Sequence, residues 1–285
     1  MRFSNRTMGH HPLETKFEDL KQIIRAYGRV LVAYSGGVDS TFLLKVALDV
    51  LGKENVLAFS GISPTYSRAE SEEAQKLAEF IGANLVMVDS SEMEDENFLM
   101  NNRNRCYHCK THLFKSAWDI AGNGGYPYVL EGSNADDMSD FRPGRKACAE
   151  QGVKSPLLEA GLTKDEIREF SKRLGLPTYN KPSQACLSSR IPYGTPVSLE
   201  ILEQIEVSEM FIKGLGITQV RVRYHGNIAR IEVEEKDLSK VLEYKDEIAG
   251  ELGNRFTYVC LDLNGYRTGS MNEPAFPEKP ALHDS

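Results

Sequence analysis

Apolar runs of five or six residues alternate with longer stretches of helical periodicity through the first half of the chain. The apolar runs, which predict buried strands, lie at residues 29–34, 55–59, 84–88 and 126–130. The periodic stretches, which predict helices, lie at residues 40–51, 67–81 and 107–121. Strands that alternate with helices of this length are typical of a parallel sheet with right-handed crossover connections. The first half of the sequence therefore predicts an α/β fold.

The pattern changes after a segment rich in Pro, Ser and Gly at residues 178–196. A capping box at Thr163 and Glu166 predicts a helix that precedes this segment and ends at Gly175. Beyond the segment, helices are predicted at residues 198–213 and 238–252 and strands at 219–224, 229–233 and 256–261. The first two of these strands flank a short turn and predict a hairpin. These elements indicate a smaller α+β domain that begins near residue 196.

Composition and charge narrow the class of protein. The chain has 285 residues, of which 41% are hydrophobic and 26% charged, as in a globular protein of about two domains. Its net charge of −7 makes general nucleic-acid binding unfavourable and fits a small-molecule substrate better. No apolar run approaches the roughly 20 residues that a membrane helix needs, and residues 1–12 lack the apolar core of a signal peptide. We therefore expect a cytoplasmic protein without a membrane partner.

The segment Ser35-Gly36-Gly37-Val38-Asp39-Ser40 joins a predicted strand to a predicted helix. Its two glycines allow a tight turn, so that successive backbone N–H groups point into one concavity at the positive end of the helix. The hydroxyls of Ser35 and Ser40 add donors, and such a cradle suits a phosphate. The segment lacks the Lys-Ser/Thr ending of a Walker loop. Because a carboxylate beside a phosphate is repulsive without a divalent cation, Asp39 predicts bound Mg²⁺.

These six residues match the SGGxDS motif, and the sequence resembles the PP-loop ATP pyrophosphatase family. Its members cleave ATP between the α and β phosphates, transfer AMP to an oxygen of the acceptor and release pyrophosphate, after which a nucleophile displaces AMP. The resemblance implies that the loop binds ATP, with Asp39 and Ser40 at the catalytic centre. It also places several residues beside the nucleotide, two at the adenine and three after a later strand: Phe59, Ser60, Gly132, Asn134 and Asp137.

The chain has an odd number of cysteines and no signal peptide, which suggests reduced thiols. They are Cys106, Cys109, Cys148, Cys186 and Cys260. The first two form a CxxC at the start of a predicted helix, and the spacing leaves three interpretations open. These are a thioredoxin-like redox pair, a zinc site completed by Cys186 with His108 or His112, and an iron–sulfur cluster held by three cysteines. Cys148 and Cys260 have no partner at ligand spacing and are predicted to be small buried thiols.

Within the PP-loop family, the sequence resembles the LarE-type sulfur transferases from about residue 20 to residue 271. The blocks that carry this resemblance lie at residues 35–40, 140–144, 186–195, 220–225, 228–232, 261–263 and 265–267. The resemblance implies that a carboxylate of pyridinium-3,5-biscarboxylate mononucleotide is adenylated and that sulfur then replaces AMP. The product is a thiocarboxylate of the nickel-pincer nucleotide, the cofactor of lactate racemase. We expect a PP-loop domain at 16–195 and a substrate and oligomerisation domain at 196–271, with disordered ends at 1–15 and 272–285.

The resemblance also bears on the source of the sulfur. Sulfur-transferring PP-loop proteins with a CxxC and a distant cysteine hold a 4Fe–4S cluster whose open iron can bind hydrosulfide, and Cys106, Cys109 and Cys186 resemble that set. In another branch of LarE proteins, which lacks the CxxC, the cysteine that matches Cys186 gives up its own sulfur and becomes dehydroalanine. The CxxC favours the cluster here. A sacrificial Cys186 without a cluster is the alternative.

Two arginines and two glutamates of the last third complete the predicted site. Arg221 and Arg223 alternate on a predicted strand and project from one face, which suits a phosphate. The LarE resemblance implies that they hold the substrate phosphate, and it matches Glu209 and Glu232 to metal ligands, the weakest of these assignments.

Other functions share parts of this pattern. A tRNA thiolase would apply the same chemistry to RNA, an amidotransferase-type ligase would combine the loop with a structural zinc, and an ATP-sensing module would release no pyrophosphate. Arg142 and Arg190 are further candidates for contact with an anionic substrate. The resemblance also implies a homo-oligomer that receives sulfide or sulfur from a separate donor.

Overall fold

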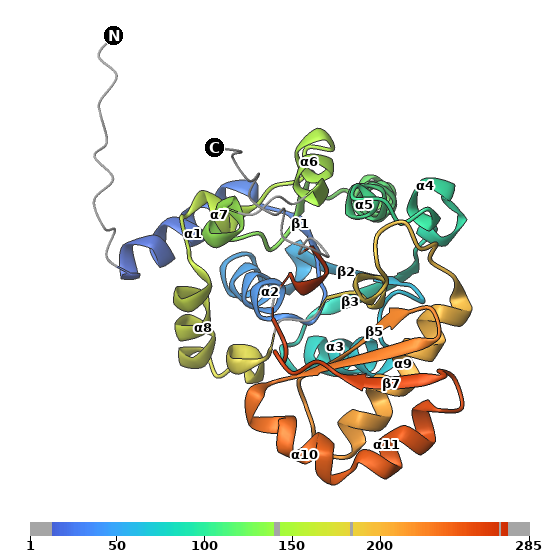
Figure 1. Ribbon diagram of the computed structural model, residues 1–285. Helices are drawn as coiled ribbons and strands as arrows, with labels where there is room; N and C mark the ends of the chain where they lie inside the picture. The colour runs from blue at the N-terminus through green and yellow to red at the C-terminus, as the bar shows by residue number, and fades with distance from the viewer. Residues whose placement is uncertain (1–12, 140–142, 183–184, 268, 273–285) are drawn as a thin grey trace, which may run out of the picture. The chain divides into compact units, whose positions relative to one another are not determined.

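The structure is a computed structural model that describes residues 13–139, 143–182, 185–267 and 269–272 (Figure 1). The predictions for the two ends of the chain and for Arg142 lie largely or wholly outside these residues. The chain divides into two compact units, Met1–Gln184 and Ala185–Ser285. This division lies before residue 196, because η5 (Leu187–Arg190) packs against α9 (Leu199–Gly214) and β5 (Val220–His225) of the second unit.

A parallel sheet with the strand order β3-β2-β1-β4 forms the centre of the first unit. Its strands are β1 (Val30–Ala33), β2 (Val56–Ile62), β3 (Asn84–Asp89) and β4 (Tyr128–Leu130). Val30 pairs with Val56 on one side of β1 and with Tyr128 on the other, and all three neighbouring pairs are parallel. The parallel α/β fold that the alternating pattern predicts is confirmed.

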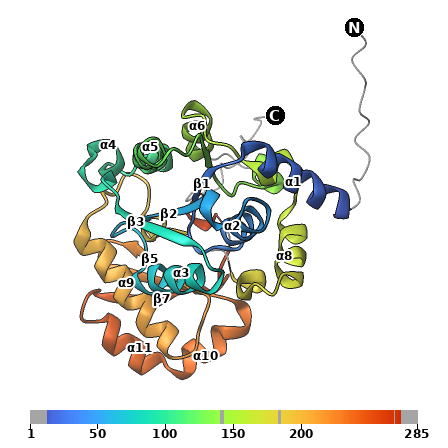
Figure 2. The ribbon, with the colours of Figure 1, turned by 180° about the vertical axis from the view of Figure 1, so that it is seen from behind.

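Helices cover both faces of this sheet. They are α1 (Leu13–Tyr27), α2 (Val38–Leu51), α3 (Arg68–Phe80), α4 (Glu96–Leu99), α5 (Arg105–Gly124), α6 (Pro143–Glu150), α7 (Pro156–Glu159) and α8 (Lys164–Arg173). Val30 and Val32 pack with α1, α2 and α8, whereas Leu31 packs with α5, because side chains alternate along a strand. On the first of these faces α3 also packs against β3 (Figure 2). The pattern did not predict α1 or the short helices α4, α6 and α7.

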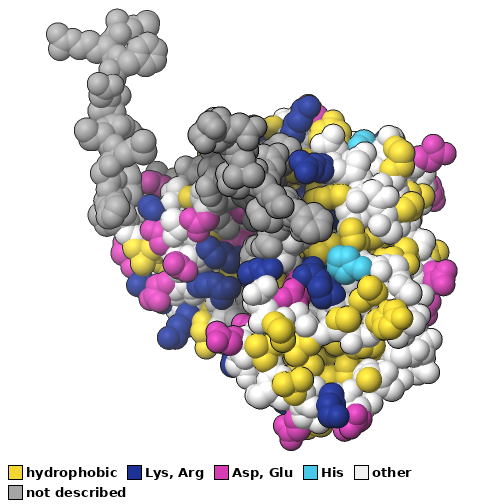
Figure 3. All heavy atoms as spheres, in the orientation of Figure 1, with side chains coloured by type: hydrophobic (Ala, Val, Ile, Leu, Met, Phe, Trp, Pro, Cys, Tyr) yellow, Lys and Arg dark blue, Asp and Glu magenta, His cyan; other side chains and the backbone are white. Residues whose placement is uncertain are grey.

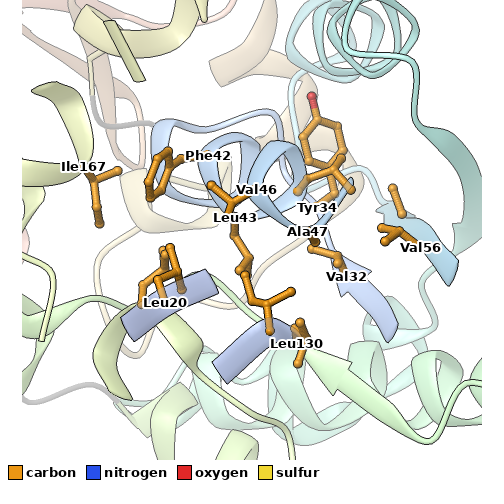
Figure 4. Close-up of a cluster of buried hydrophobic side chains, with 14 of the residues drawn as sticks. Leu20, Val32, Tyr34, Phe42, Leu43, Val46, Ala47, Val56, Leu130 and Ile167 are labelled. Atoms are coloured by element: carbon orange, nitrogen blue, oxygen red, sulfur yellow. The ribbon is translucent and has the colours of Figure 1, made fainter. Parts of the chain in front are cut away.

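The apolar core under α2 fixes the elements that surround the candidate site. Figure 4 shows Phe42 of α2 beside Ile167 of α8, with Leu20 of α1 and Val32 of β1 in the same cluster. The ring of Phe170 in α8 stacks on Phe42, with centroids 6.1 Å apart. The start of α2 and the start of α8 are therefore held by one core. The predicted capping box at the start of α8 is confirmed.

The outer surface of α1 and α8 mixes acidic and basic side chains (Figure 3). Lys16 pairs with Glu166 at 2.8 Å and Arg173 with Glu14 at 2.6 Å. Among the described helices, none combines the length and the apolar character that crossing a membrane requires.

The second unit holds a smaller sheet in the order β5-β6-β7, with β6 at Ile228–Val233 and β7 at Tyr258–Leu261. The predicted hairpin of β5 and β6 is confirmed as antiparallel, and β7 runs parallel to β6. Helices α9, α10 (Leu238–Glu243) and α11 (Lys245–Leu252) pack on one face of this sheet. The prediction of one helix over 238–252 is wrong, because Tyr244, with φ −94° and ψ 18°, leaves the helical region and separates α10 from α11.

Candidate active site

The order of the strands reverses at β1, so the carboxyl ends of β1 and β4 lie at a topological switch point. The chain proceeds from β1 to β2 and β3 on one side and then returns to place β4 on the other side of β1. In open α/β sheets, ligands bind at such a topological switch point. The Ser35–Ser40 loop follows β1, and Gly132 and Asn134 follow β4. The Ser35–Ser40 loop and the segment after β4 are therefore the two predicted site segments that meet directly at this switch point.

The Ser35–Ser40 loop requires its first glycine. Gly36 has φ +67°, and a Cβ there would lie 2.6 Å from Cβ of Ala74 in α3. Gly37 is the N-cap of α2 and has no side chain to cover the N–H groups of the first turn. Ser40 Oγ accepts from the Ser35 N–H at 3.2 Å and lies 3.1 Å from Ser35 Oγ. The loop is therefore folded as a cradle whose N–H groups and hydroxyls suit a phosphate.

Asp39 is the carboxylate of this cradle and joins the loop to the segment after β4. Asn134 Nδ2 donates to Asp39 Oδ1 at 3.3 Å. A Cβ on Gly132 would lie 3.1 Å from the Ser40 nitrogen and 3.3 Å from Asp39 Cβ, so the close approach of the two segments requires glycine. An oxygen ligand at 23% exposure beside a phosphate cradle fits Mg²⁺, which prefers carboxylates and phosphate oxygens.

Two lysines that the sequence analysis missed converge on the same loop. Lys164 Nζ forms an ion pair with Asp39 Oδ2. Lys181 Nζ donates to the Gly36 carbonyl at 3.2 Å and pairs with Glu73 at 2.9 Å. The sequence held a signal for the first of them. A cation in the first turn of a helix opposes the helix dipole at a cost of roughly 0.3–1 kcal/mol, so a lysine directly after an N-cap indicates another role.

The other residues predicted near the nucleotide divide into two groups. Asp137 accepts from the Asn134 N–H at 3.0 Å and so shapes the turn that presents Asn134. Phe59 is buried against α5, on the sheet face opposite the cluster that contains Ala58 and α2. Ser60 alternates with Phe59 and therefore shares the face of Ala58. Of the two residues predicted at the adenine, Ser60 lies on the loop's side of the sheet and Phe59 on the other.

The CxxC lies at the start of α5, as predicted. Cys106 is exposed and Cys109 is half-buried. Residues three apart on a helix share a face, and a helix N-terminus stabilises thiolates, so this pair fits two ligands of a metal cluster. Among the described residues, no group of three or more His, Cys, Asp or Glu side chains is arranged to hold a metal ion. Cys186 belongs to the second unit, and the three-cysteine set stays a prediction.

The histidines near the CxxC are bound to a carboxylate. His112 Nε2 lies 3.0 Å from Asp95 Oδ2, and His108 Nδ1 lies 3.5 Å from the same oxygen. Burial opposes the charged form of Asp95, but hydrogen bonds from His112 and Asn97 outweigh it and hold the pKa of this carboxyl below its usual value. The zinc interpretation required one of these histidines as a ligand. In the structure both contact Asp95.

The two cysteines predicted to be buried differ. Cys148 of α6 is buried beside α5, as predicted. The prediction for Cys260 is wrong, because it is exposed. It lies on β7, the last strand of its sheet, where Val259 and Leu261 pack on the helical core and Cys260 points to the other face.

We expect thiol alkylation to separate these two cysteines. Burial raises the pKa of Cys148 to about 11, so its thiolate fraction at pH 8 is lower by about 100-fold than that of an ordinary thiol. Iodoacetamide at pH 8 should modify Cys260 and leave Cys148 intact, as measured by peptide mass mapping. In denaturant both should react. Equal modification of the two in the folded protein would contradict the burial of Cys148.

The predicted arginines lie on the sheet face of the second unit that the helices leave uncovered. Arg221 and Arg223 are buried and lie opposite Glu232 and Arg230 on β6. Arg223 Nη2 donates to Glu232 Oε2 at 2.7 Å and to Ser270 Oγ at 3.1 Å. The guanidinium carbon of Arg221 lies 5.4 Å from the ring centroid of Tyr266.

Arg190 and Glu209 form a second buried charge pair. Nε and Nη2 of Arg190 donate to the two carboxylate oxygens of Glu209 at 2.9 and 3.0 Å, and both side chains are at most 3% exposed. Burial alone would raise the pKa of Glu209, but the charge and hydrogen bonds of Arg190, the charge of Arg221 and the Val222 N–H together outweigh it and lower that pKa. Burial and the neighbouring Arg190 lower the pKa of Arg221. Arg190 thus forms a buried ion pair within its own unit, and metal binding by Glu209 and Glu232 stays a prediction.

Cys186 is the N-cap residue of η5, the short helix that carries Arg190. Its Sγ lies 3.1 Å from Ser188 Oγ, and its carbonyl accepts from Arg190 Nη1 at 2.8 Å. The thiol is half-buried. The ion pair of Arg190 with Glu209 therefore fixes the backbone on which Cys186 is presented.

The fold and the loop define the class of protein: a PP-loop α/β protein whose loop lies at the switch point of its sheet. Residues 14–106, which contain the loop, match the family model described as NAD synthase.

Comparison with whole proteins narrows the family. An uncharacterized protein of Synechocystis sp. is 43% identical over 265 residues, which cover 91% of this chain and 98% of that protein. The pyridinium-3,5-bisthiocarboxylic acid mononucleotide synthase of Lactiplantibacillus plantarum is 39% identical over 262 residues, which cover 92% of this chain and 95% of that protein. The chain belongs to the LarE family of PP-loop enzymes, to which this synthase belongs. The tRNA-specific 2-thiouridylase MnmA of Desulforamulus reducens is 24% identical over 54% of the chain.

Proposed function

We propose that the protein is an ATP-dependent sulfur transferase that acts on a carboxylate of pyridinium-3,5-biscarboxylate mononucleotide. The observation that carries this proposal is the Ser35–Ser40 cradle at the switch point, with Asp39 held beside Gly132 and Asn134. The substrate is supported by the activity after which the L. plantarum synthase is named, a protein that the chain matches over almost its whole length.

The reaction has two steps. A carboxylate oxygen of the substrate attacks the α-phosphorus of ATP, the bond from that phosphorus to the oxygen shared with the β-phosphate breaks, and pyrophosphate leaves. A sulfur nucleophile then attacks the acyl carbon, the bond from this carbon to the oxygen of AMP breaks, and a thiocarboxylate remains. The loop N–H groups and Lys164 lie where they can stabilise the charge that develops on the phosphates. Mg²⁺ held by Asp39 would neutralise phosphate charge.

The second unit offers a site for the phosphate of the substrate. A bound phosphate would stabilise the charged guanidinium of Arg221, whose pKa is lowered by burial and by Arg190. The forked donors of Arg221 and Arg223 suit phosphate oxygens.

A 4Fe–4S cluster held by Cys106, Cys109 and Cys186 would supply an open iron that binds hydrosulfide. The position of Cys106 and Cys109 on one face at the start of α5, with Cys106 exposed, supports this assignment. The half-buried thiol of Cys186 supports a role in sulfur transfer by either route. Oligomer formation, a cytoplasmic location and the identity of the sulfur donor stay predictions.

Metal analysis of protein prepared without oxygen distinguishes the two sulfur sources. We expect about four irons and four acid-labile sulfides per chain, and their loss in Cys106→Ala. The matched control is Cys260→Ala, which should retain the iron because Cys260 lies on β7 and is not one of the three predicted ligands. Zinc or no metal would contradict the cluster, and dehydroalanine at Cys186 after turnover would then support the sacrificial route.

The proposed reaction is tested by pyrophosphate release. With ATP and Mg²⁺, release should depend on the mononucleotide, and mass spectrometry should show its adenylate before sulfur is added. Release that depends on tRNA would favour a thiolase, and product formation that requires ammonia would favour a ligase. No release with any acceptor would contradict an adenylating enzyme.

A further inference from the structure

The carboxylate assigned to Mg²⁺ already has a cation. Lys164 Nζ contacts Asp39 Oδ2, and the two side chains are 31% and 23% exposed. The other oxygen, Oδ1, accepts from Asn134 Nδ2 at 3.3 Å. A divalent ion at Asp39 would meet the positive charge of Lys164 at contact distance. Metal and lysine therefore compete for one carboxylate.

We propose that Lys164 is an exchangeable placeholder for the divalent cation. In the nucleotide-free protein it neutralises Asp39, and when the metal–ATP complex enters, the metal takes Asp39 while the lysine moves to the triphosphate. This inference rests on the proposed function in so far as Asp39 binds the metal and ATP is the nucleotide. Lys164 would then couple the two binding events: the metal binds Asp39 tightly only when the triphosphate binds too and takes over the contact with the lysine.

The exchange requires no movement of the backbone. The N–H of Lys164 donates to Asp136 Oδ2 at 2.8 Å, and the reciprocal bonds of Thr163 and Glu166 fix the start of α8. Only the flexible four-carbon side chain has to move. The phosphate cradle and Asp39 are adjacent, because Ser40 closes the cradle directly after Asp39. With its backbone held in place, Lys164 can therefore contact the carboxylate first and the phosphate afterwards by moving its side chain alone.

Lys181 provides the contrast. Its Nζ donates to the Gly36 carbonyl and pairs with Glu73, and its side chain is only 10% exposed. It contacts the same loop from the α3 side without contacting Asp39 in the structure. A change at Lys181 should therefore not alter competition at the carboxylate.

The proposal predicts effects of opposite sign in one variant. Without nucleotide, Lys164→Met should bind Mn²⁺ about tenfold more tightly than the wild type, because the competing charge at Asp39 is gone. With the non-cleavable analogue α,β-methylene-ATP, the same variant should bind the Mn²⁺ complex about tenfold more weakly, because a charge-assisted contact to phosphate is lost. Lys164→Arg should restore both values towards those of the wild type.

The experiment is Mn²⁺ titration of the full chain by electron paramagnetic resonance, without and with the analogue. Lys181→Met should leave the affinity for Mn²⁺ alone unchanged, and Asp39→Asn should abolish that binding. Thermal melts confirm that each variant is folded. If Lys164→Met binds Mn²⁺ alone as tightly as the wild type or more weakly, the proposed role of Lys164 is overturned. That result leaves the proposed adenylation untouched, because the pyrophosphate assay tests it separately. Binding of Mn²⁺ that survives in Asp39→Asn overturns the assignment of the metal to Asp39, and the placeholder with it.

Discussion

Asp39→Asn should lower the rate of pyrophosphate release from ATP by about 100- to 1,000-fold. Asparagine keeps the shape and can still contact Asn134, but it removes the charge that holds the divalent cation beside the phosphates. Preorganised charge at a departing group is typically the largest single contribution to such a reaction, and the loss of one element of it produces an effect of this size. The measurement is the initial rate of mononucleotide-dependent pyrophosphate release at saturating ATP.

The matched control is Asp49→Asn, at the opposite end of the same helix. Asp49 pairs with Lys45 on the surface at 2.5 Å and is 48% exposed. We expect its replacement to leave the rate within about twofold of the wild type, because exposed ion pairs contribute little. If Asp39→Asn retained more than a tenth of the wild-type rate, the central role of this carboxylate would be refuted.

Glu209→Gln should lower the free energy of unfolding by about 3–5 kcal/mol at pH 7, because it leaves the buried guanidinium of Arg190 without its counter-charge. The glutamine oxygen can still accept from the Val222 N–H, which donates to Glu209 at 3.0 Å, so the change isolates the charge pair. Denaturant titration of both proteins gives the difference. The same variant should also weaken the support of the Cys186 backbone, which Arg190 holds.

The effect should depend on pH with a defined sign. Because the pKa of Glu209 is lowered in the folded state, its stabilising contribution is fully present above the unfolded pKa of about 4.3 and is lost as the pH falls through the lower folded value. The difference between wild type and Glu209→Gln should therefore shrink on acidification below about pH 4.3. Glu169→Gln, which removes an exposed partner of Arg173, should cost no more than about 1 kcal/mol. A similar loss in both variants would contradict the buried pair.

Local sequence was sufficient to predict most of the strands and longer helices and the phosphate cradle. The loop between β1 and α2 can be recognised because Gly36 must adopt a positive φ and because Gly37 leaves the first turn of α2 uncovered. The capping box of α8 and the hairpin of β5 and β6 are equally local, and both are confirmed. Such features depend on residues within a few positions of one another, so periodicity and turn chemistry encode them directly.

Contacts between distant residues depended on the tertiary structure. Lys164 reaches Asp39 across 125 positions of the chain, and only the shared core of α2 and α8 brings them together. Arg190, a candidate for contact with an anionic substrate, pairs with Glu209 in the structure, and Arg223, predicted on a phosphate-binding strand face, pairs with Glu232; all four side chains are buried. Cys260 became exposed because β7 lies at the edge of its sheet. A linear pattern specifies which side chains share a face of one element. The packing of whole elements decides which side chains meet, and therefore which charged residues find a partner of opposite charge.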